Sequence, residues 1–329
     1  MASVDSCLEA AALPAHEHAV GLSIILCTWN NATRLGTTLD AIARCFVPDS
    51  LFWELVLVNN NCTDHTDEVV ARFTGSLPIR YVREPRQGLS CARNAGLKVA
   101  SGRLILFTDD DVIPGPGWIA EYWKAFQARP SGYYFGGPLE SEFEADAPDE
   151  ELLRVAPPSV KGLGWGPSER ELAPGEKFVS ANWACPREAL DAAGNFDTRF
   201  GLDPSSKLVR VGEESELMRR LQEAGWRSWY LPAARLRHFV PAQKSNLRHI
   251  VERREASRFC VAAFDSAGVP LGRRPLVTYT RVVLGIVIWW LSWSYARSRG
   301  RNAHVEYVRL RRMIGRMRGI RHRRRAAAG

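Results

Sequence analysis

The sequence predicts an α/β protein with a mainly parallel central sheet, followed by a helical C-terminal region that associates with a membrane. Two observations predict this fold. Between residues 21 and 107, short apolar runs alternate with helical patterns, which is typical of parallel strands joined by right-handed helical crossovers. After Pro241 the sequence changes to a mixed-charge helical pattern, an apolar segment and an arginine-rich end. The 329 residues, 46% apolar and 24% charged, are ordinary for a globular protein and exclude wholesale disorder.

The first elements follow directly from these patterns. Four runs are apolar enough to be strands that are buried on both faces, and the segments between them have helical periodicity. The predicted strands are 22–27, 53–58, 79–82 and 103–107, and the predicted helices are 33–45, 64–73 and 89–100.

The middle of the chain is less regular. Residues 141–176 are acidic and then rich in Gly and Pro, which predicts either a functional lid or a poorly ordered segment. Regular structure resumes with a strand at 177–185 and a helix that begins at Pro186. A helix at 213–223 and a strand at 226–231 follow.

The C-terminal region is predicted to contain a helix at 245–266, an apolar segment at 275–296 and a basic tail at 297–325. The tail has twelve arginines and one acid, a local excess of +11, so the remainder of the chain carries −3 of the total +8. Such a tail fits a phosphate-rich surface, either anionic lipid or nucleic acid. We expect an anionic membrane surface to be the partner and expect no nucleic acid.

The apolar segment allows three interpretations. Its uninterrupted part, 282–296, has 15 residues, fewer than the roughly 20 that a spanning helix needs, although including Arg281 would lengthen it enough. A span would place the arginine tail on the far side of the membrane, against the positive-inside tendency. Tryptophans flanked by arginines favour a segment that lies in the plane of the interface. In-plane association is therefore the preferred interpretation, with a single span and a soluble packed helix as alternatives.

The cysteines and the N-terminus indicate the compartment. Seven scattered cysteines without a Cys-x-x-Cys pair argue against a disulfide framework or structural zinc and favour a reducing compartment. The first 20 residues carry acids and histidines and lack a signal-peptide pattern. We therefore expect a cytoplasmic protein associated with the inner face of the cell membrane.

The residues that predict chemistry follow the strands. Asp109, Asp110 and Asp111 come directly after an apolar strand, at the carboxyl edge where parallel sheets bind ligands. Two carboxylates one residue apart can share a hard divalent cation that keeps other positions for water and substrate phosphates. The loops Thr28–Asn31 and Asn59–Asp64 follow the first two strands, and Arg93 lies at the start of the helix after the third. Asn clusters alone are also typical of turns and caps.

Taken together, these segments resemble glycosyltransferase family 2, the inverting enzymes with the GT-A nucleotide-sugar-binding fold. The resemblance covers residues 21–240 through eight motifs in the family's order. They are SIILCTWNNATRL, ELVLVNNNCTDHT, RQGLSCARNAGL, LILFTDDDVIP, SANWACPREAL, NFDTRFG, GEESELMRRL and YLPAARLRH. The implied organisation is an N-terminal extension at 1–20, a GT-A catalytic domain at 21–240 and a helical C-terminal region at 241–329.

The resemblance implies a role for each matching residue. The implied donor and nucleotide contacts are Thr28, Asn30, Asn59, Asp64, Arg93, Asp109 and Asp110, with Asp110 chiefly a spacer. The implied ligands of a divalent metal, Mn²⁺ or Mg²⁺, are Asp111, Asp109 and His238. Glu214 corresponds to the catalytic base, and Asn182, Trp183 and Glu213 lie on the acceptor side.

Three departures from the family pattern matter. Asn59 stands where an aspartate usually pairs with the base, which leaves the choice of nucleotide open. Glu213-Glu214 replaces the usual Glu-Asp pair, so the base has a longer side chain. The Gln-x-x-Arg-Trp motif of processive members is absent, which favours addition of one sugar per acceptor.

The predicted function is metal-dependent transfer of a single sugar, with inversion, from a nucleotide-sugar donor to a saccharide or lipid-linked acceptor. Polysaccharide or envelope glycan assembly is the expected setting. Two alternatives remain: a nucleotidyltransferase on a related fold, and a non-enzymatic basic module that binds membranes or nucleic acid. The first usually has a Gly-rich loop after the first strand, and the second leaves the eight ordered motifs unexplained.

Overall fold

The structure, a computed structural model, describes residues 19–206, 208–264 and 275–328. The chain divides into two compact units. The first consists of Met1–Glu140, Leu163–Asp197 and Leu217–His238, and the second of Ser141–Gly162, Thr198–Glu216 and Phe239–Gly329. Each unit has its own hydrophobic core.

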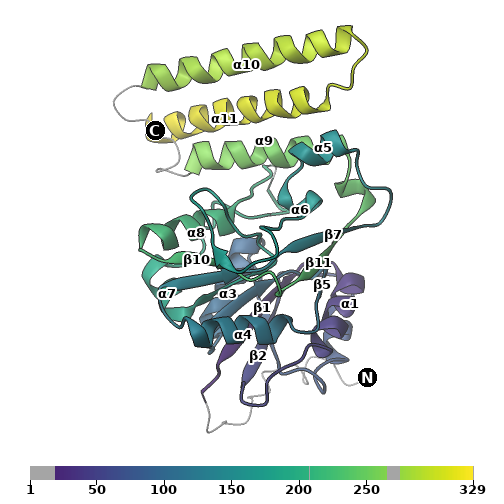
Figure 1. Cartoon of the computed structure of the whole chain (residues 1–329), viewed down its shortest axis with the longest axis vertical. Helices are drawn as coiled ribbons and strands as arrows, with labels where there is room; N and C mark the ends of the chain where they lie inside the picture. Colours follow the sequence, from purple (N-terminus) through teal and green to yellow (C-terminus); the bar gives the residue numbers. More distant parts are fainter. Residues whose placement is uncertain (1–18, 207, 265–274, 329) are drawn as a thin grey trace. The chain divides into compact units, whose positions relative to one another are not determined.

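Four parallel strands form one half of the central sheet of the first unit, in the order β3-β2-β1-β4 (Figure 1). They are β1 (Leu22–Thr28), β2 (Trp53–Asn59), β3 (Ile79–Arg83) and β4 (Leu104–Thr108). Runs of Leu, Ile and Val bury both faces of β1, β2 and β4, as a parallel sheet covered by helices requires. Each predicted strand agrees with the observed one to within one residue at either end.

The other half of the sheet is mixed. β9 (Trp183–Pro186) runs antiparallel to β4 and to β6 (Tyr133–Gly136). β10 (Arg227–Tyr230) is parallel to β6, and β8 (Arg170–Glu171) is antiparallel to β10 at the edge. The strand predicted at 177–185 begins only at Trp183, because the residues before it form a turn in which the Asn182 N–H donates to the Val179 carbonyl at 3.1 Å.

Helices cover both faces of this sheet. α1 (Ala32–Ala43), α2 (Thr66–Ala71) and α4 (Trp118–Ala128) contribute to one apolar cluster. α3 (Leu89–Val99), α7 (Arg187–Ala193) and the part of α8 (Glu213–Glu223) from Leu217 onward contribute to the other.

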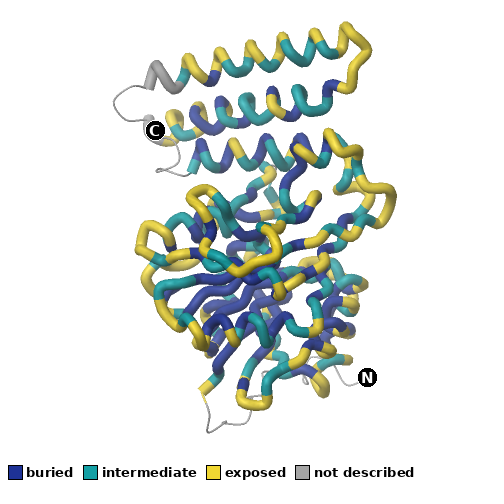
Figure 2. The backbone as a smooth tube through the Cα atoms, in the orientation of Figure 1, coloured by how far each residue is buried: buried dark blue, intermediate teal, exposed yellow. Residues whose placement is uncertain are grey.

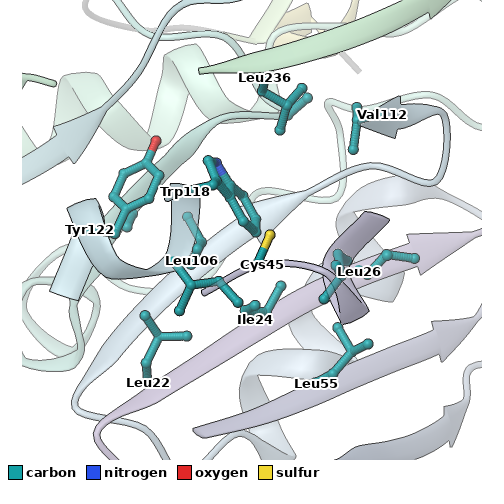
Figure 3. Close-up of a cluster of buried hydrophobic side chains, with 14 of the residues drawn as sticks. Leu22, Ile24, Leu26, Cys45, Leu55, Leu106, Val112, Trp118, Tyr122 and Leu236 are labelled. Carbon is teal, nitrogen blue, oxygen red and sulfur yellow. The ribbon is translucent and has the colours of Figure 1, made fainter. Parts of the chain in front are cut away.

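Along β1 the two clusters alternate residue by residue. Leu22, Ile24 and Leu26 belong to the first cluster, whereas Ile25 and Cys27 belong to the second. Figure 3 shows the first cluster, in which Trp118 and Tyr122 of α4 lie with the side chains of the strands. This period of two is what a strand between two helical layers requires.

A small sheet adjoins the end of β4. Its order is β5-β11-β7, with β5 (Val112–Pro114), β11 (Leu236–Val240) and β7 (Leu139–Phe143). β5 and β11 are antiparallel, and His238 lies opposite Val112. This pairing brings a histidine from late in the chain next to the aspartate run that precedes β5.

The second unit is mainly helical. α5 (Glu150–Val155) and α6 (Pro158–Lys161) lie in the segment predicted to be irregular, and the short 3-10 helix η2 (Ala242–Lys244) precedes α9. α9 (Leu247–Phe264), α11 (His304–Ala328) and α10 (Pro275–Ser298) form a layer with α11 in the middle (Figure 1).

The predicted basic tail is thus largely the helix α11, which packs closely against α9. A Cβ atom at Gly315 would lie 2.3 Å from the Glu255 carbonyl oxygen, and one at Gly319 would lie 2.5 Å from that of Phe259. The equal steps of four residues show that α9 and α11 run parallel. Arginine is also a good helix former, so a charged segment can continue as a helix when one face packs.

α10 has an apolar face that is open to solvent. Leu284, Ile288, Leu291 and Tyr295 are between 51% and 59% exposed, and Val287 is 45% exposed. Figure 2 shows that most of α10 consists of exposed and half-buried residues. None of the helices in the described residues is long and apolar enough to cross a membrane.

Candidate donor site and family

The aspartate run is fixed at its backbone by a residue of α1. The Thr38 hydroxyl, fully buried, lies 3.0 Å from the Asp110 carbonyl oxygen and 2.8 Å from that of Val112, and it accepts from the Val112 N–H at 3.1 Å. A turn that follows a buried strand needs such partners for its backbone groups. The packing of α1 on the sheet therefore holds the backbone at Asp110 and Val112 in place.

Asp110 joins the ends of two strands. Its carboxylate accepts from the Thr28 hydroxyl at 2.6 Å and from the Asn31 side-chain amide at 2.8 Å. Burial raises the pKa of Asp110 to about 7, and the charge of Asp111 adds to this rise although the two hydrogen bonds oppose it. Both carboxylate oxygens of Asp110 thus accept hydrogen bonds from side chains at the end of β1 and in the loop after it, and the Thr28 hydroxyl is one of the two donors.

Asp109 pairs with a buried arginine of α3. Arg93 is 1% exposed, and its Nη2 donates to Asp109 Oδ1 at 3.1 Å and to the Ser180 hydroxyl at 3.1 Å. The guanidinium also lies over the Phe196 ring, 5.5 Å from its centroid. A buried cation requires such partners, because an unpaired charge is costly in the interior. One predicted donor cation and one predicted donor carboxylate are therefore adjacent.

Asp111 faces the histidine of β11. His238 Nε2 lies 3.4 Å from Asp111 Oδ1, with both side chains largely buried. The other ring nitrogen of His238, Nδ1, is buried and has no hydrogen-bond partner in the described part of the chain. Within the same residues no group of three or more His, Cys, Asp or Glu side chains is placed to hold a metal ion. The structure brings together two of the three predicted metal ligands as a pair.

Asn59, at the end of β2, is engaged inside the protein. Its Nδ2 donates to the Tyr81 hydroxyl at 2.7 Å and to Asp67 Oδ1 at 3.2 Å, and its Oδ1 accepts from the Cys62 N–H at 2.7 Å. The side chain is buried. The edge of Asn59 that was expected to meet a nucleobase is thus occupied by β3 and α2 residues in this conformation.

Asn30 and Asp64 tie the first two strand-end loops together. Asn30 adopts a left-handed backbone with φ of 48°, and its Oδ1 accepts from the Thr63 N–H at 2.7 Å. Asp64 accepts from the Ala32 N–H at the start of α1 at 3.0 Å and from the Thr66 hydroxyl at the start of α2 at 2.6 Å. Burial alone would raise the pKa of Asp64, but these hydrogen bonds lower it overall. Asp64 therefore binds the first residue of both α1 and α2.

The sequence prediction did not include Asn60, whose side chain holds the backbone of the loop after β3. Its Nδ2 donates to the carbonyls of Glu84 at 3.0 Å and Arg86 at 2.8 Å, and its Oδ1 accepts from the Gly88 N–H at 2.9 Å. Gly88 has φ of 127°, a conformation that favours glycine. The run of three asparagines was the available signal, but the sequence does not reveal which of the three turns inward.

The predicted acceptor residues differ in burial. Asn182 and Trp183 are both 0% exposed. Asn182 Oδ1 accepts from Trp118 Nε1 at 2.8 Å and from the Tyr122 hydroxyl at 2.9 Å, and Trp183 stacks on Phe107. Both residues therefore lie in the core of the first unit in this structure.

Glu213 and Glu214 stand in the first turn of α8, where the helix dipole favours carboxylates. Glu213 is 4% exposed, and Glu214 is half-buried. They belong to the segment of the chain that is grouped with the second unit.

Comparison with known proteins gives the family. Residues 23–149, which include all of β1 but its first residue, the strand-end loops and the aspartate run, match the sequence model of glycosyl transferase family 2. The chain carries a family 2 glycosyltransferase domain. The validoxylamine A glucosyltransferase of Streptomyces hygroscopicus subsp. jinggangensis is 35% identical over 156 residues, 43% of this chain and 36% of that protein.

Other relatives extend the comparison. The hyaluronan synthase of Pasteurella multocida is 34% identical over 113 residues, 33% of this chain and 11% of that protein. The family 2 domain thus spans only a small part of these longer relatives. A mannosyltransferase from Pyrobaculum calidifontis, solved in complex with GDP-Man and Mn²⁺, superposes with a TM-score of 0.59 over 91% of this chain and 88% of its own, at 17% identity. This likeness confirms the predicted α/β fold with a mainly parallel central sheet.

Proposed function

We propose that the protein transfers a single sugar, with inversion, from a nucleotide-sugar donor to a hydroxyl group of a saccharide or lipid-linked acceptor. The observation that carries the proposal is the group formed by Asp109, Asp111, Arg93 and His238 at the carboxyl end of β4. Ligands of open α/β sheets bind at this edge. The family match and the glycosyltransferase relatives support the same reaction class.

The donor set at this edge fits a divalent metal such as Mn²⁺ or Mg²⁺. Asp111 and His238 offer a carboxylate and an imidazole, and the buried Nδ1 of His238 has no hydrogen-bond partner among the described residues. Hard cations commonly use one or two protein carboxylates and complete their shell with water and substrate phosphates, so a set of three protein ligands is not required. A bound cation would supply positive charge that stabilises the departing nucleoside diphosphate.

The remaining residues would bind and position the donor. Arg93 supplies a fixed positive charge beside Asp109, where it can balance diphosphate oxygens. Asn30, which is exposed, is the best placed of the strand-end side chains to meet the nucleoside. Thr28, Asn59 and Asp64 would act by holding the loops, because their polar atoms already have protein partners.

Glu214 would serve as the general base. Its carboxylate would accept the proton of the acceptor hydroxyl, whose oxygen then attacks the anomeric carbon from the face opposite the leaving group. One displacement of this kind inverts the configuration without a covalent intermediate. Glu213 would lie beside it on the acceptor side.

The donor site can be tested by thermal unfolding with a series of nucleoside diphosphates. We expect one of them to raise the unfolding temperature of the protein only in the presence of Mn²⁺, and Asp111→Asn to abolish this rise. Asp40→Asn, which changes an exposed carboxylate on α1, is the matched control and should respond like the wild type. A wild-type response that does not require the metal would contradict the proposed site.

The products separate this function from its rivals. A sugar transferase releases a nucleoside diphosphate from the donor, whereas a nucleotidyltransferase forms or consumes pyrophosphate. A non-enzymatic module releases neither. Assays of nucleoside diphosphate and pyrophosphate with a panel of nucleotide sugars would identify the reaction. The identity of the acceptor would then show whether the reaction belongs to polysaccharide or envelope glycan assembly.

We also propose that α10 attaches the protein to the inner, cytoplasmic face of an anionic membrane, with no nucleic-acid partner. The exposed stripe of Leu284, Ile288, Leu291 and Tyr295 is spaced so that one side of the helix is apolar. Arg297 and Arg299 stack on Trp293 and Tyr295 at the end of this helix, so cations border the stripe. Aromatic residues next to arginines suit the boundary between headgroups and acyl chains.

Flotation with vesicles that contain phosphatidylglycerol tests this attachment. We expect wild-type protein to float and the double variant Leu284→Gln, Leu291→Gln to remain largely in the unbound fraction. Phe46→Gln removes an apolar side chain that is 64% exposed in the other unit and should leave flotation unchanged. Equal flotation of the double variant and the wild type would refute the role of α10.

A further inference from the structure

The second unit contains a cluster of cations that has no acidic members. The cluster extends over one side of α9 and α11 and reaches α6. We call it the cation cluster, and its members are Lys161, Arg254, Arg258, Arg309, Arg312 and Arg316.

Helix geometry places these residues together. Arg254 and Arg258 are four residues apart on α9, and Arg312 and Arg316 are four residues apart on α11, so each pair lies on one side of its helix. Because α9 and α11 run parallel in close contact, the two pairs form adjacent rows. Arg254 is held in place by a hydrogen bond from its Nε to the Val155 carbonyl at 2.6 Å.

Carboxylates do not neutralise this charge. In the described part of the chain no ion pair joins a member of the cation cluster to an Asp or Glu. Glu255, the buried acid between α9 and α11, already binds Arg311 and Arg318, each at 2.7 Å. Glu252 pairs with Arg248. The interface thus provides acids for other arginines but none for these six residues.

The absence of acidic partners among the described residues has an electrostatic cost. Burial lowers the pKa of Arg312 to about 10, and the charges of Arg258, Arg254 and Arg309 add to this shift. The pKa of Lys161 is lowered by burial and by Arg254. The like charges of these side chains repel one another in a partly desolvated place. A bound anion would remove this repulsion.

We propose that the cation cluster binds a phosphate or diphosphate group. Guanidinium groups present paired N–H donors that match phosphate oxygens, and Arg is preferred where such bidentate recognition is needed. The positive charge of several arginines is greater than a single carboxylate group can neutralise. The cluster therefore fits a ligand with two or more negative charges. The group could be carried by a lipid or by a soluble molecule, which share this chemistry. The cluster lies wholly in the second unit, so the inference stands independently of the proposed sugar transfer.

The test uses the full chain in EDTA, with inorganic pyrophosphate as the probe and NaCl added to keep the ionic strength constant. Removal of the metal prevents metal-dependent binding at the proposed donor site, so pyrophosphate should raise the unfolding temperature of Asp111→Asn as much as that of the wild type. We expect pyrophosphate to raise the unfolding temperature of the wild type. The double variant Arg258→Gln, Arg312→Gln should bind pyrophosphate at least about tenfold more weakly, since it loses two charge-assisted contacts.

A control and a second measurement separate binding from folding. Arg301→Gln, Arg325→Gln removes the same charge outside the cluster and should retain the wild-type affinity. Without anion, the cluster variant should unfold at the same or a higher temperature than the wild type, because repulsion is relieved. The proposal is overturned if pyrophosphate does not bind the wild type, if the cluster variant binds it equally well, or if that variant unfolds at a lower temperature without anion.

Vesicles distinguish the two sources of the phosphate group. If the group belongs to a lipid, vesicles with phosphatidic acid should bind the wild type more tightly than the cluster variant, and pyrophosphate should compete. If the group is soluble, the two proteins should bind these vesicles equally while differing in pyrophosphate affinity. Either result supports phosphate recognition by the cation cluster.

Discussion

At the residue scale, the polar side chains at the strand ends have two kinds of partner. Asn60 and Asp64 bind backbone groups of neighbouring loops, whereas Asp111 and His238 face each other, with Nε2 of the histidine 3.4 Å from the carboxylate. Loops at the carboxyl edge of a parallel sheet leave backbone groups that need partners. Part of the polar sequence is therefore used to hold the loops at this edge of the sheet.

Asn60→Ala should destabilise the first unit. The change leaves the Glu84 and Arg86 carbonyls and the Gly88 N–H without their partner in a buried place, which we expect to cost about 2–3 kcal/mol in the free energy of unfolding. Urea titration measures this loss. Asn195→Ala, at an exposed position, is the control and should change the free energy by less than about 0.5 kcal/mol.

Asp110 should make stability depend on pH. Its pKa of about 7 in the folded protein exceeds the usual value of 3.8, so the folded state holds more protons than the unfolded state between these values. The free energy of unfolding should therefore fall as pH rises from 5.5 to 8, in the presence of EDTA. Urea titrations at the two pH values should show a smaller fall for Asp110→Asn. An equal fall in both proteins would contradict the raised pKa.

Glu214→Gln should reduce the rate of sugar transfer by at least about 100-fold, because a neutral amide cannot accept the acceptor proton. Donor binding, measured by calorimetry with Mn²⁺, should remain close to that of the wild type. Glu223→Gln changes an exposed carboxylate at the other end of α8 and should leave kcat nearly unchanged. Substantial activity in Glu214→Gln would exclude it as the base.

At the scale of elements, the sequence pattern of α11 does not predict that this helix packs against α9. Its composition is that of a charged tail, yet Gly315 and Gly319 let its backbone approach α9, and Val308 and Ile320 are buried. Arg311 and Arg318 from the same helix hold Glu255 of α9. The helix is therefore fixed by close contact and ion pairs more than by an apolar stripe.

Gly319→Ala tests this close contact. Alanine favours a helix by about 1 kcal/mol over glycine, but here its Cβ would meet the Phe259 carbonyl. We expect a net loss of about 1–2 kcal/mol in the free energy of unfolding. Gly36→Ala in α1, where the nearest atom would be 3.7 Å away, should instead stabilise the protein slightly. Thermal and urea unfolding should thus show changes in the free energy of unfolding of opposite sign for the two variants, relative to the wild type.

At the scale of the whole molecule, positive charge is concentrated in the helices of the second unit. Residues 297–325 contain twelve arginines, whereas the rest of the chain has a net charge of −3. Attraction between such a surface and anionic lipid is screened by salt, with a Debye length of about 10 Å at 0.1 M. We expect flotation with phosphatidylglycerol vesicles to fall as NaCl rises from 0.05 to 0.5 M. No dependence on salt would exclude an electrostatic contribution.

The sequence by itself determined the alternation of strands and helices, the four parallel strands and the position of the aspartate run. These features depend on local periodicity, so α8 matches its predicted bounds of 213–223. The order of β9, β6 and β10, the internal partners of Asn59 and Asp110, and the burial of Asn182 were decided only by the tertiary structure. The packing of α11 against α9 and the grouping of the cation cluster were also decided only by the tertiary structure. Each of these joins residues distant in the chain, and a pattern of neighbouring residues does not specify which distant groups will meet.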